Sequence, residues 1–180
     1  MQSKRVTIKD IARELGVSPS TVSRAMKDHP DISSETKKQV NELVEKLKYR
    51  PNTVALSLRS RKTNIIALVV PEIVHHFFSS VISGIEEVAQ EAGYHVMIFQ
   101  SNESYEREVA IVQSLASMQI DGLLVSVAKT SMKFGHFNEL MNEGIPLVFF
   151  DRACEEIQAD KVVVDDFTGA YNAVEYLIRT

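Results

Sequence analysis

The 180-residue sequence predicts an all-α helix-turn-helix headpiece followed by an α/β lobe built on a parallel sheet. Apolar residues recur at helical spacing up to about residue 50, and from residue 65 short apolar runs alternate with helical stripes. The charge also changes sign along the chain. Residues 1–62 hold 14 Lys and Arg against 7 Asp and Glu, a net charge of +7, whereas residues 63–180 hold 6 against 17, a net charge of −11. A basic head indicates a polyanionic partner, although a solvated charged surface would give the same balance.

The start of the chain has the spacing of two short helices joined by a tight turn. Thr7 can cap the first helix, and Gly16 is placed to end it in a left-handed conformation. Ser18 can cap the second helix, with Pro19 at the first position, where a missing N–H costs nothing. The apolar stripes are Ile8, Ile11, Ala12 and Leu15 in the first helix, and Val22, Ala25 and Met26 in the second. This arrangement is typical of a helix-turn-helix.

A third helix is expected after the turn at residues 28–31, with Ser33 or Ser34 as its cap. Its apolar stripe is Val40, Leu43, Val44 and Leu47. Three helices with one shared apolar centre predict a small bundle.

The polar side of the second helix must then largely face outward, and it carries Ser20, Thr21, Ser23 and Arg24. The second helix of such a unit enters the major groove of DNA. Hydroxyls can contact phosphates or base edges, and an arginine can hold guanine O6 and N7 together. The pattern therefore favours DNA binding, with a solvated, well-capped helix as the alternative.

Several short motifs of the head carry a family resemblance. They are Val-Thr-Ile-Lys-Asp-Ile-Ala at 6–12, Gly-Val-Ser at 16–18, Thr-Val-Ser-Arg at 21–24 and Tyr-Arg-Pro-Asn at 49–52. Together they resemble the headpiece of the LacI/GalR family of bacterial transcription regulators, and the resemblance runs through the rest of the chain. It implies that Pro19, Ser20 and Arg24 read bases, with Pro19 limited to apolar contact. It also implies phosphate-contacting or helix-capping roles for Thr7, Ser18, Thr21 and Ser23, which would fix register.

Residues 51–62 form the expected linker between the headpiece, residues 1–50, and the body of the chain. An isolated helix of this length is marginal in water, so a plain connector is one interpretation. The family resemblance implies a hinge helix that orders on operator DNA and enters the minor groove. Asn52, Ala55 and Leu58 match its groove contacts, and Leu58 matches an apolar wedge that opens the central base step.

The body alternates expected strands and helices, which indicates a parallel sheet with right-handed crossovers. The strands are expected at residues 65–70, 94–99, 121–126, 145–150 and 162–164. The helices are expected at about residues 78–89, 105–118 and 137–141. Ligands of such sheets sit beyond the carboxyl ends of the strands.

The resemblance makes residues 63–161 the N-terminal lobe of a periplasmic-binding-protein-like effector domain. The expected effector is a small molecule, a sugar or related metabolite, and its expected contacts are Phe77, Phe78, Ser126, Asp151 and Arg152. Each has a structural alternative: Phe78 fits the apolar helical stripe, and Asp151 with Arg152 can simply end a strand. The adjacent pair His75 and His76 does not make a metal-ligand set, so no metal and no cofactor are expected.

Residues 162–180 read as the start of a second lobe, in which Ala170, Ala173, Val174 and Leu177 would have little to cover them. We therefore expect a truncated C-terminal lobe. The full-length protein is expected to act as a homodimer on a near-palindromic double-stranded operator, as a repressor controlled by its effector.

Other functional classes are less well supported. With no apolar segment behind residues 1–5, no run of membrane-spanning length and a lone Cys154, a cytoplasmic protein is expected. Asp151, Asp165, Asp166 and His75 are scattered and belong to no catalytic motif, so no enzyme and no catalytic residues are expected. The alternative to a regulator is a cytosolic solute-binding protein without DNA function.

Overall fold

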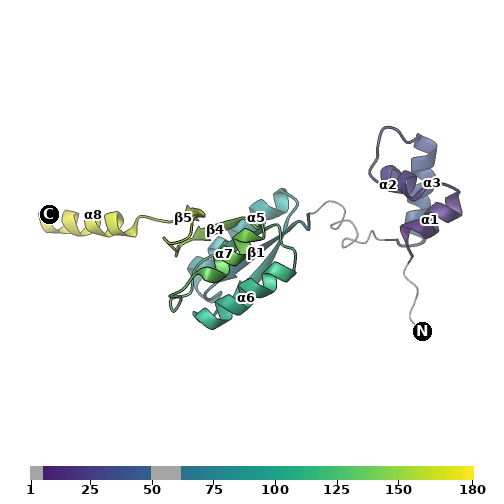
Figure 1. Cartoon of the computed structure of the whole chain (residues 1–180). Helices are drawn as coiled ribbons and strands as arrows, with labels where there is room; N and C mark the ends of the chain where they lie inside the picture. Colours follow the sequence, from purple (N-terminus) through teal and green to yellow (C-terminus); the bar gives the residue numbers. More distant parts are fainter. Residues whose placement is uncertain (1–5, 50–61) are drawn as a thin grey trace. The chain divides into compact units, whose positions relative to one another are not determined.

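The computed structural model describes residues 6–49 and 62–180, and the chain divides into two compact units, Met1–Arg59 and Ser60–Thr180 (Figure 1). We call residues 6–49 the head and residues 62–165 the lobe. The expected hinge contacts Asn52, Ala55 and Leu58 lie outside the described residues.

The head consists of three helices, α1 (Ile8–Leu15), α2 (Pro19–Met26) and α3 (Ser34–Lys46). Thr7 precedes α1, and Gly16 ends it at a φ of 66°, a left-handed conformation that glycine adopts without steric cost. The hydroxyl of Ser18 accepts the Thr21 N–H, and Pro19 takes the first position of α2. Ser33 caps α3 in the same way as Ser18 caps α2. These helices confirm the predicted helix-turn-helix.

One apolar cluster holds the three helices together. Its buried members are Ile11, Ala12, Val22, Ala25, Val40 and Leu43. Ile11, Val22 and Val40 are each 0% exposed and come from three different helices, so each helix contributes one fully buried anchor. Met26, expected in this core, is only half-buried at its edge, because it is the last residue of α2.

The lobe is built on a five-stranded, all-parallel sheet in the order β2-β1-β3-β4-β5. The strands are β1 (Ile65–Val70), β2 (His95–Gln100), β3 (Gly122–Val125), β4 (Leu147–Phe150) and β5 (Asp160–Val162). The helices that connect them are α5 (His76–Glu91), α6 (Tyr105–Ser117) and α7 (Gly135–Asn142). The predicted alternation of strands and helices is therefore confirmed.

Helices cover both faces of the sheet (Figure 1), and each face has its own apolar cluster. On one face, α6 and α7 contribute Val112, Leu115, Phe137 and Leu140, which pack against side chains such as Val69. On the other face, α5 contributes Phe78 and Ile82, which pack against Leu68, Val70 and Phe150. Successive residues of β1 therefore pack on opposite faces of the sheet, because side chains alternate along a strand with a period of two.

Two details differ from the sequence-based expectation. The fifth strand ends at Val162, and the expected strand residues Val163 and Val164 are exposed. Val88, expected in the buried stripe of α5, is 67% exposed, because that stripe narrows to Ile82, Ile85 and Ala89 near the helix end.

The last helix, α8 (Asp166–Arg179), has no buried residues. Ala170, Ala173, Val174 and Leu177 are all exposed, as expected from the sequence.

One carboxylate fixes the start of the lobe at the amino end of the sheet. Asp121 accepts hydrogen bonds from the Thr63 N–H at 2.8 Å, the Thr63 hydroxyl at 2.9 Å and the Asn64 N–H at 2.9 Å. Partial burial alone would raise the pKa of Asp121, but these three donors and the charge of Lys62 hold it below its usual value. The first strand therefore begins from a position that is tied to the start of β3.

Candidate nucleic-acid interface and ligand site

The side of α2 that turns away from the head core is polar and basic. Val22 and Ala25 are buried, whereas Ser20 and Arg24, one helical turn apart, are exposed. Within the described residues, no side chain pairs with the Arg24 guanidinium. The arginine thus keeps its fork of N–H donors available for a partner outside the chain.

A cluster of hydroxyls lies at the start of α2. The Ser18 oxygen lies 2.7 Å from the Ser20 hydroxyl and 2.8 Å from the Thr21 hydroxyl, and it also accepts the Thr21 N–H at 3.1 Å. Ser23 is half-buried, one turn further along than Ser20 and next to Arg24. Pro19 is exposed at the first position of the helix. Donors, acceptors and the free N–H groups of a helix start therefore occupy one side of the head.

Two residues that sequence reasoning missed belong to this description. Lys27 is exposed three residues after Arg24, so it extends the same helix face, and the spacing alone could have identified it. Asp10 accepts both the Thr7 N–H at 3.0 Å and the Thr7 hydroxyl at 2.7 Å. The Thr7 side chain is therefore oriented by the first turn of α1.

At the carboxyl edge of the sheet, the structure brings together only some of the expected ligand residues. Ser126 follows β3 and donates its hydroxyl to Asp151 Oδ2 at 3.2 Å, just after β4. Phe77 is 50% exposed and meets Phe78 edge-to-face, with ring centroids 5.2 Å apart. Phe78 itself is 5% exposed in the sheet core. This burial matches the structural alternative for Phe78, because the ring packs in a core cluster with side chains of β1 and β4.

Glu103 joins three strand ends at this edge. Arg152 Nη1 donates to both of its carboxylate oxygens at 2.9 Å. The Lys129 N–H donates to Oε2 at 2.8 Å. Partial burial favours a raised pKa for Glu103, but these hydrogen bonds and the two positive charges outweigh it, so the pKa lies below its usual value. Arg152 thus faces Glu103 as well as the expected partner Asp151.

A second carboxyl group, that of the buried Glu108, binds the segment that follows β3. It is 0% exposed, and it accepts the Ala128 N–H at 2.8 Å, the Ser131 hydroxyl at 2.8 Å and His136 Nε2 at 3.1 Å. These contacts satisfy the polar atoms of a carboxyl group that would otherwise be costly to bury. Sequence reasoning missed Glu108 because a glutamate in the first turn of a helix is normally exposed.

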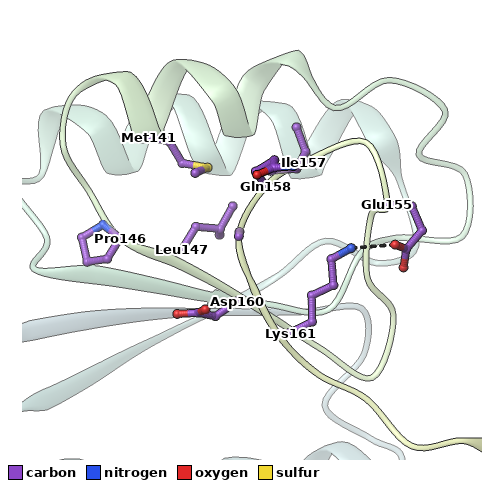
Figure 2. A pocket seen from close by; sticks show the side chains of 9 residues that line it. Met141, Pro146, Leu147, Glu155, Ile157, Gln158, Asp160 and Lys161 are labelled. Carbon is purple, nitrogen blue, oxygen red and sulfur yellow. Dashed lines mark hydrogen bonds and ion pairs between the residues drawn. The ribbon is translucent and has the colours of Figure 1, made fainter.

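Two hollows mark the surface of the lobe. One, of about 420 Å³, lies at the carboxyl edge, where it is lined by Glu103, Ser104, Tyr105, Glu106, Thr130, Met132 and Lys133. The other, of about 670 Å³, lies by the amino ends of β4 and β5 (Figure 2). Figure 2 shows Met141, Leu147 and Ile157 around it, with Lys161 paired to Glu155 at 2.9 Å. None of the expected ligand residues lines either hollow. The first hollow is related to them only through Glu103, which lines it and binds Arg152.

Residues 6–49 and 62–180 contain no cluster of three or more His, Cys, Asp or Glu side chains that could hold a metal ion. Over the same residues, no helix has the length and apolar character needed to cross a bilayer.

Comparisons with known proteins agree with both units. Residues 7–52 match the family described as bacterial regulatory proteins, lacI family, and residues 66–180 match the periplasmic binding protein domain. The chain is 32% identical over 96% of its length to Catabolite control protein A of Priestia megaterium, of which it covers 52%. It is 34% identical over 96% of its length to the HTH-type transcriptional repressor PurR of Vibrio atlanticus (strain LGP32), again covering 52%.

A solved structure shares the fold. A lac repressor dimer bound to operator and the anti-inducer ONPF superposes with a TM-score of 0.80 and 23% identity, covering 98% of this chain and 53% of that chain. The chain spans about half the length of the curated relatives it matches.

Proposed function

The chain belongs to the LacI family of bacterial regulatory proteins, and from this premise we propose that it is a sequence-specific DNA-binding transcription regulator controlled by a small-molecule effector. The relatives named above are a catabolite control protein and a transcriptional repressor. We propose repression as the mode of action and a sugar or related metabolite as the effector. Both units have a part in this proposal: the head binds DNA and the lobe binds the effector.

The observation that carries the proposal is the outward face of α2. Ser20 and Arg24 are exposed on a helix whose opposite side is fully buried, and the guanidinium has no partner within the described chain. A short helix held this way fits the major groove with its first residues toward the base edges. The excess of basic residues over residues 1–62 supplies attraction to phosphates.

The proposed roles follow from these positions. Arg24 and Ser20 hydrogen-bond base edges, and Pro19 makes an apolar contact. Thr7, Ser18, Thr21 and Ser23 contact phosphates or hold the helix starts. Asn52, Ala55 and Leu58, outside the described residues, are proposed minor-groove contacts of a hinge helix. A homodimer is the proposed assembly.

The proposed effector site lies at the carboxyl edge of the lobe. Phe77 offers an exposed ring, and Asp151, oriented by Ser126, offers a carboxylate oxygen. Arg152 belongs to the same edge but is already bound by Glu103.

The test is selection of bound sequences from a random DNA pool, followed by gel shifts of the enriched duplex at increasing salt. We expect one enriched motif and a steep loss of affinity with salt. Failure to retain any duplex would refute the proposal and favour a solute-binding protein without DNA function. Retention of all sequences equally would refute base reading by α2.

A further inference from the structure

The carboxyl edge of the lobe carries many charges but no excess of either sign. The four segments at this edge, residues 71–78, 100–107, 126–134 and 151–152, contain four acidic and four basic side chains. Arg152 is the cation that adjoins the proposed ligand residue Asp151. The net charge beside Asp151 therefore depends on which groups of the protein already bind the Arg152 guanidinium.

Two carboxylates flank Arg152. Its Nη1 lies 2.9 Å from both oxygens of Glu103, and its Nε lies 3.9 Å from Asp151 Oδ2. Nη1 also approaches the Val127 carbonyl at 3.4 Å. The second cation of this group, Lys129, has its Nζ 3.9 Å from Glu103 Oε1. Glu103 thus offsets the positive charge of Arg152 and of Lys129.

The main chain fixes Glu103 in this position. Asn102 and Glu103 both have a left-handed backbone, with φ values of 52° and 57°, which is uncommon for residues other than glycine. The Lys129 N–H donates to the Glu103 carboxylate and the Thr130 hydroxyl donates to its carbonyl, both at 2.8 Å. With its lowered pKa, the carboxyl group stays ionised at neutral pH. The loop after β3 therefore keeps a negative charge against Arg152.

Asp151 and Phe77, the proposed ligand residues at this edge, suit the hydroxyl groups of a ligand. Asp151 Oδ2 accepts the Ser126 hydroxyl, and within the described residues Oδ1 has no partner. A carboxylate oxygen accepts hydrogen bonds from hydroxyls and repels anions. The half-exposed ring of Phe77 adds an apolar face of the kind that a sugar ring can cover.

We propose that Glu103 is a specificity-determining residue, by which this edge selects an uncharged polyhydroxyl ligand and rejects phosphorylated or carboxylated ones. The inference rests on the proposed function of the lobe as an effector domain, and it names the chemical class of that effector. Glu103 acts through Arg152: it keeps the guanidinium in place as a donor of hydrogen bonds while cancelling its attraction for anions.

The test is a titration of the whole chain with inorganic phosphate, followed through the NMR signals of the Arg152 guanidinium. In the wild type we expect no saturable shift at millimolar phosphate. Glu103→Gln retains an oxygen acceptor for the Lys129 N–H and removes the charge. We expect this variant to bind phosphate at Arg152 about tenfold or more tightly than the wild type, the factor expected for a charge-assisted hydrogen bond. The double variant E103Q/R152Q should lose this gain.

Glu106→Gln is the matched control. It removes the same charge from the same edge, but the Glu106 carboxylate contacts the Ser104 hydroxyl and not Arg152. We expect it to behave as the wild type. A saturable shift at Arg152 in the wild type would overturn the proposal, as would equal phosphate binding by E103Q and E106Q.

Folding and function are separable in this design. Backbone amide spectra report whether E103Q is folded. If it is not, Glu103→Asp, which withdraws the carboxylate by one methylene, should give a smaller gain in the same direction, and no gain would count against the proposal. The titration contains no DNA, so its result does not depend on whether the chain binds DNA. Failure to bind DNA would refute the proposed function, and the phosphate titration would still test the role of Glu103.

Discussion

The head and the lobe fix their polar side chains over very different distances along the chain. Around α2, Ser18 contacts Ser20 and Thr21, two and three residues away. At the carboxyl edge of the lobe, Glu108 accepts from a residue 20 positions away, and Glu103 from one 49 positions away. The recognition face of the head therefore depends on one helix and its cap, whereas the ligand edge depends on the whole lobe being folded.

The largest expected effect is in the lobe. Glu108→Ala removes a fully buried carboxylate and leaves the Ala128 N–H and the His136 ring without their partner. We expect the free energy of unfolding of the lobe to fall by about 3–5 kcal/mol, because buried donors lose their acceptor at a cost of about 1–3 kcal/mol each. Urea denaturation followed by residue-resolved NMR would measure this and would report head and lobe separately.

Glu87→Ala is the control for this change, because Glu87 is exposed on α5, on the other face of the sheet. We expect its effect to stay within about 0.5 kcal/mol. The head signals should keep the same midpoint in both variants. A parallel loss of stability in the head would show that the two units do not unfold independently, and the contrast between them would fail.

The next effect is in the head and concerns binding more than stability. Arg24→Ala removes an exposed guanidinium that has no partner within the described residues, so folding of the head should be almost unchanged. We expect a loss of about 1–3 kcal/mol in binding to the selected operator, with relaxed preference at one base pair. Lys46→Ala, an exposed cation in the last turn of α3, is the comparison. Equal losses on all sequences would count against a base contact.

A smaller effect is expected at the amino end of the sheet. The folded state lowers the pKa of Asp121 from its ordinary value of 3.8 through three hydrogen bonds and the nearby Lys62. Its contribution to stability is therefore present above that value and is lost as the pH falls through the folded pKa. Asp121→Asn should cost about 1 kcal/mol at neutral pH, the net worth of a hydrogen bond. It should also flatten the acid limb of the curve of lobe stability against pH.

Asp160→Asn serves as the control, since Asp160 is exposed at the same edge and has no partner among the described residues. If D121N and D160N give the same dependence of stability on pH, the anchor at Thr63 and Asn64 contributes nothing measurable.

These contrasts explain how much the sequence could foretell. In the head, caps and apolar spacing located all three helices, because Ser18 and Gly16 act through neighbours within one turn and each apolar stripe repeats at helical spacing. In the lobe, apolar runs located four of the five strands and indicated a parallel sheet, but they placed the fifth strand two residues too late. The sequence did not predict the roles of Glu103 and Glu108. Their hydrogen-bond donors lie 20 or more residues away along the chain, and no local sequence pattern indicates such contacts.

The smallest expected effect is at Val88 in α5, where the helical spacing of apolar residues predicts burial that the structure does not show. The sequence places Val88 in the apolar stripe of α5, but the structure leaves it 67% exposed, whereas Ile82 is 7% exposed in the same helix. Ile82→Ala should cost about 2–4 kcal/mol of lobe stability through lost burial and a cavity. Val88→Ala should change stability by less than about 0.5 kcal/mol and in the stabilising direction, because alanine is the better helix former on a solvated face. A loss close to that of I82A in the same urea experiment would mean that Val88 is covered in solution, and the narrow apolar contact of α5 would be wrong.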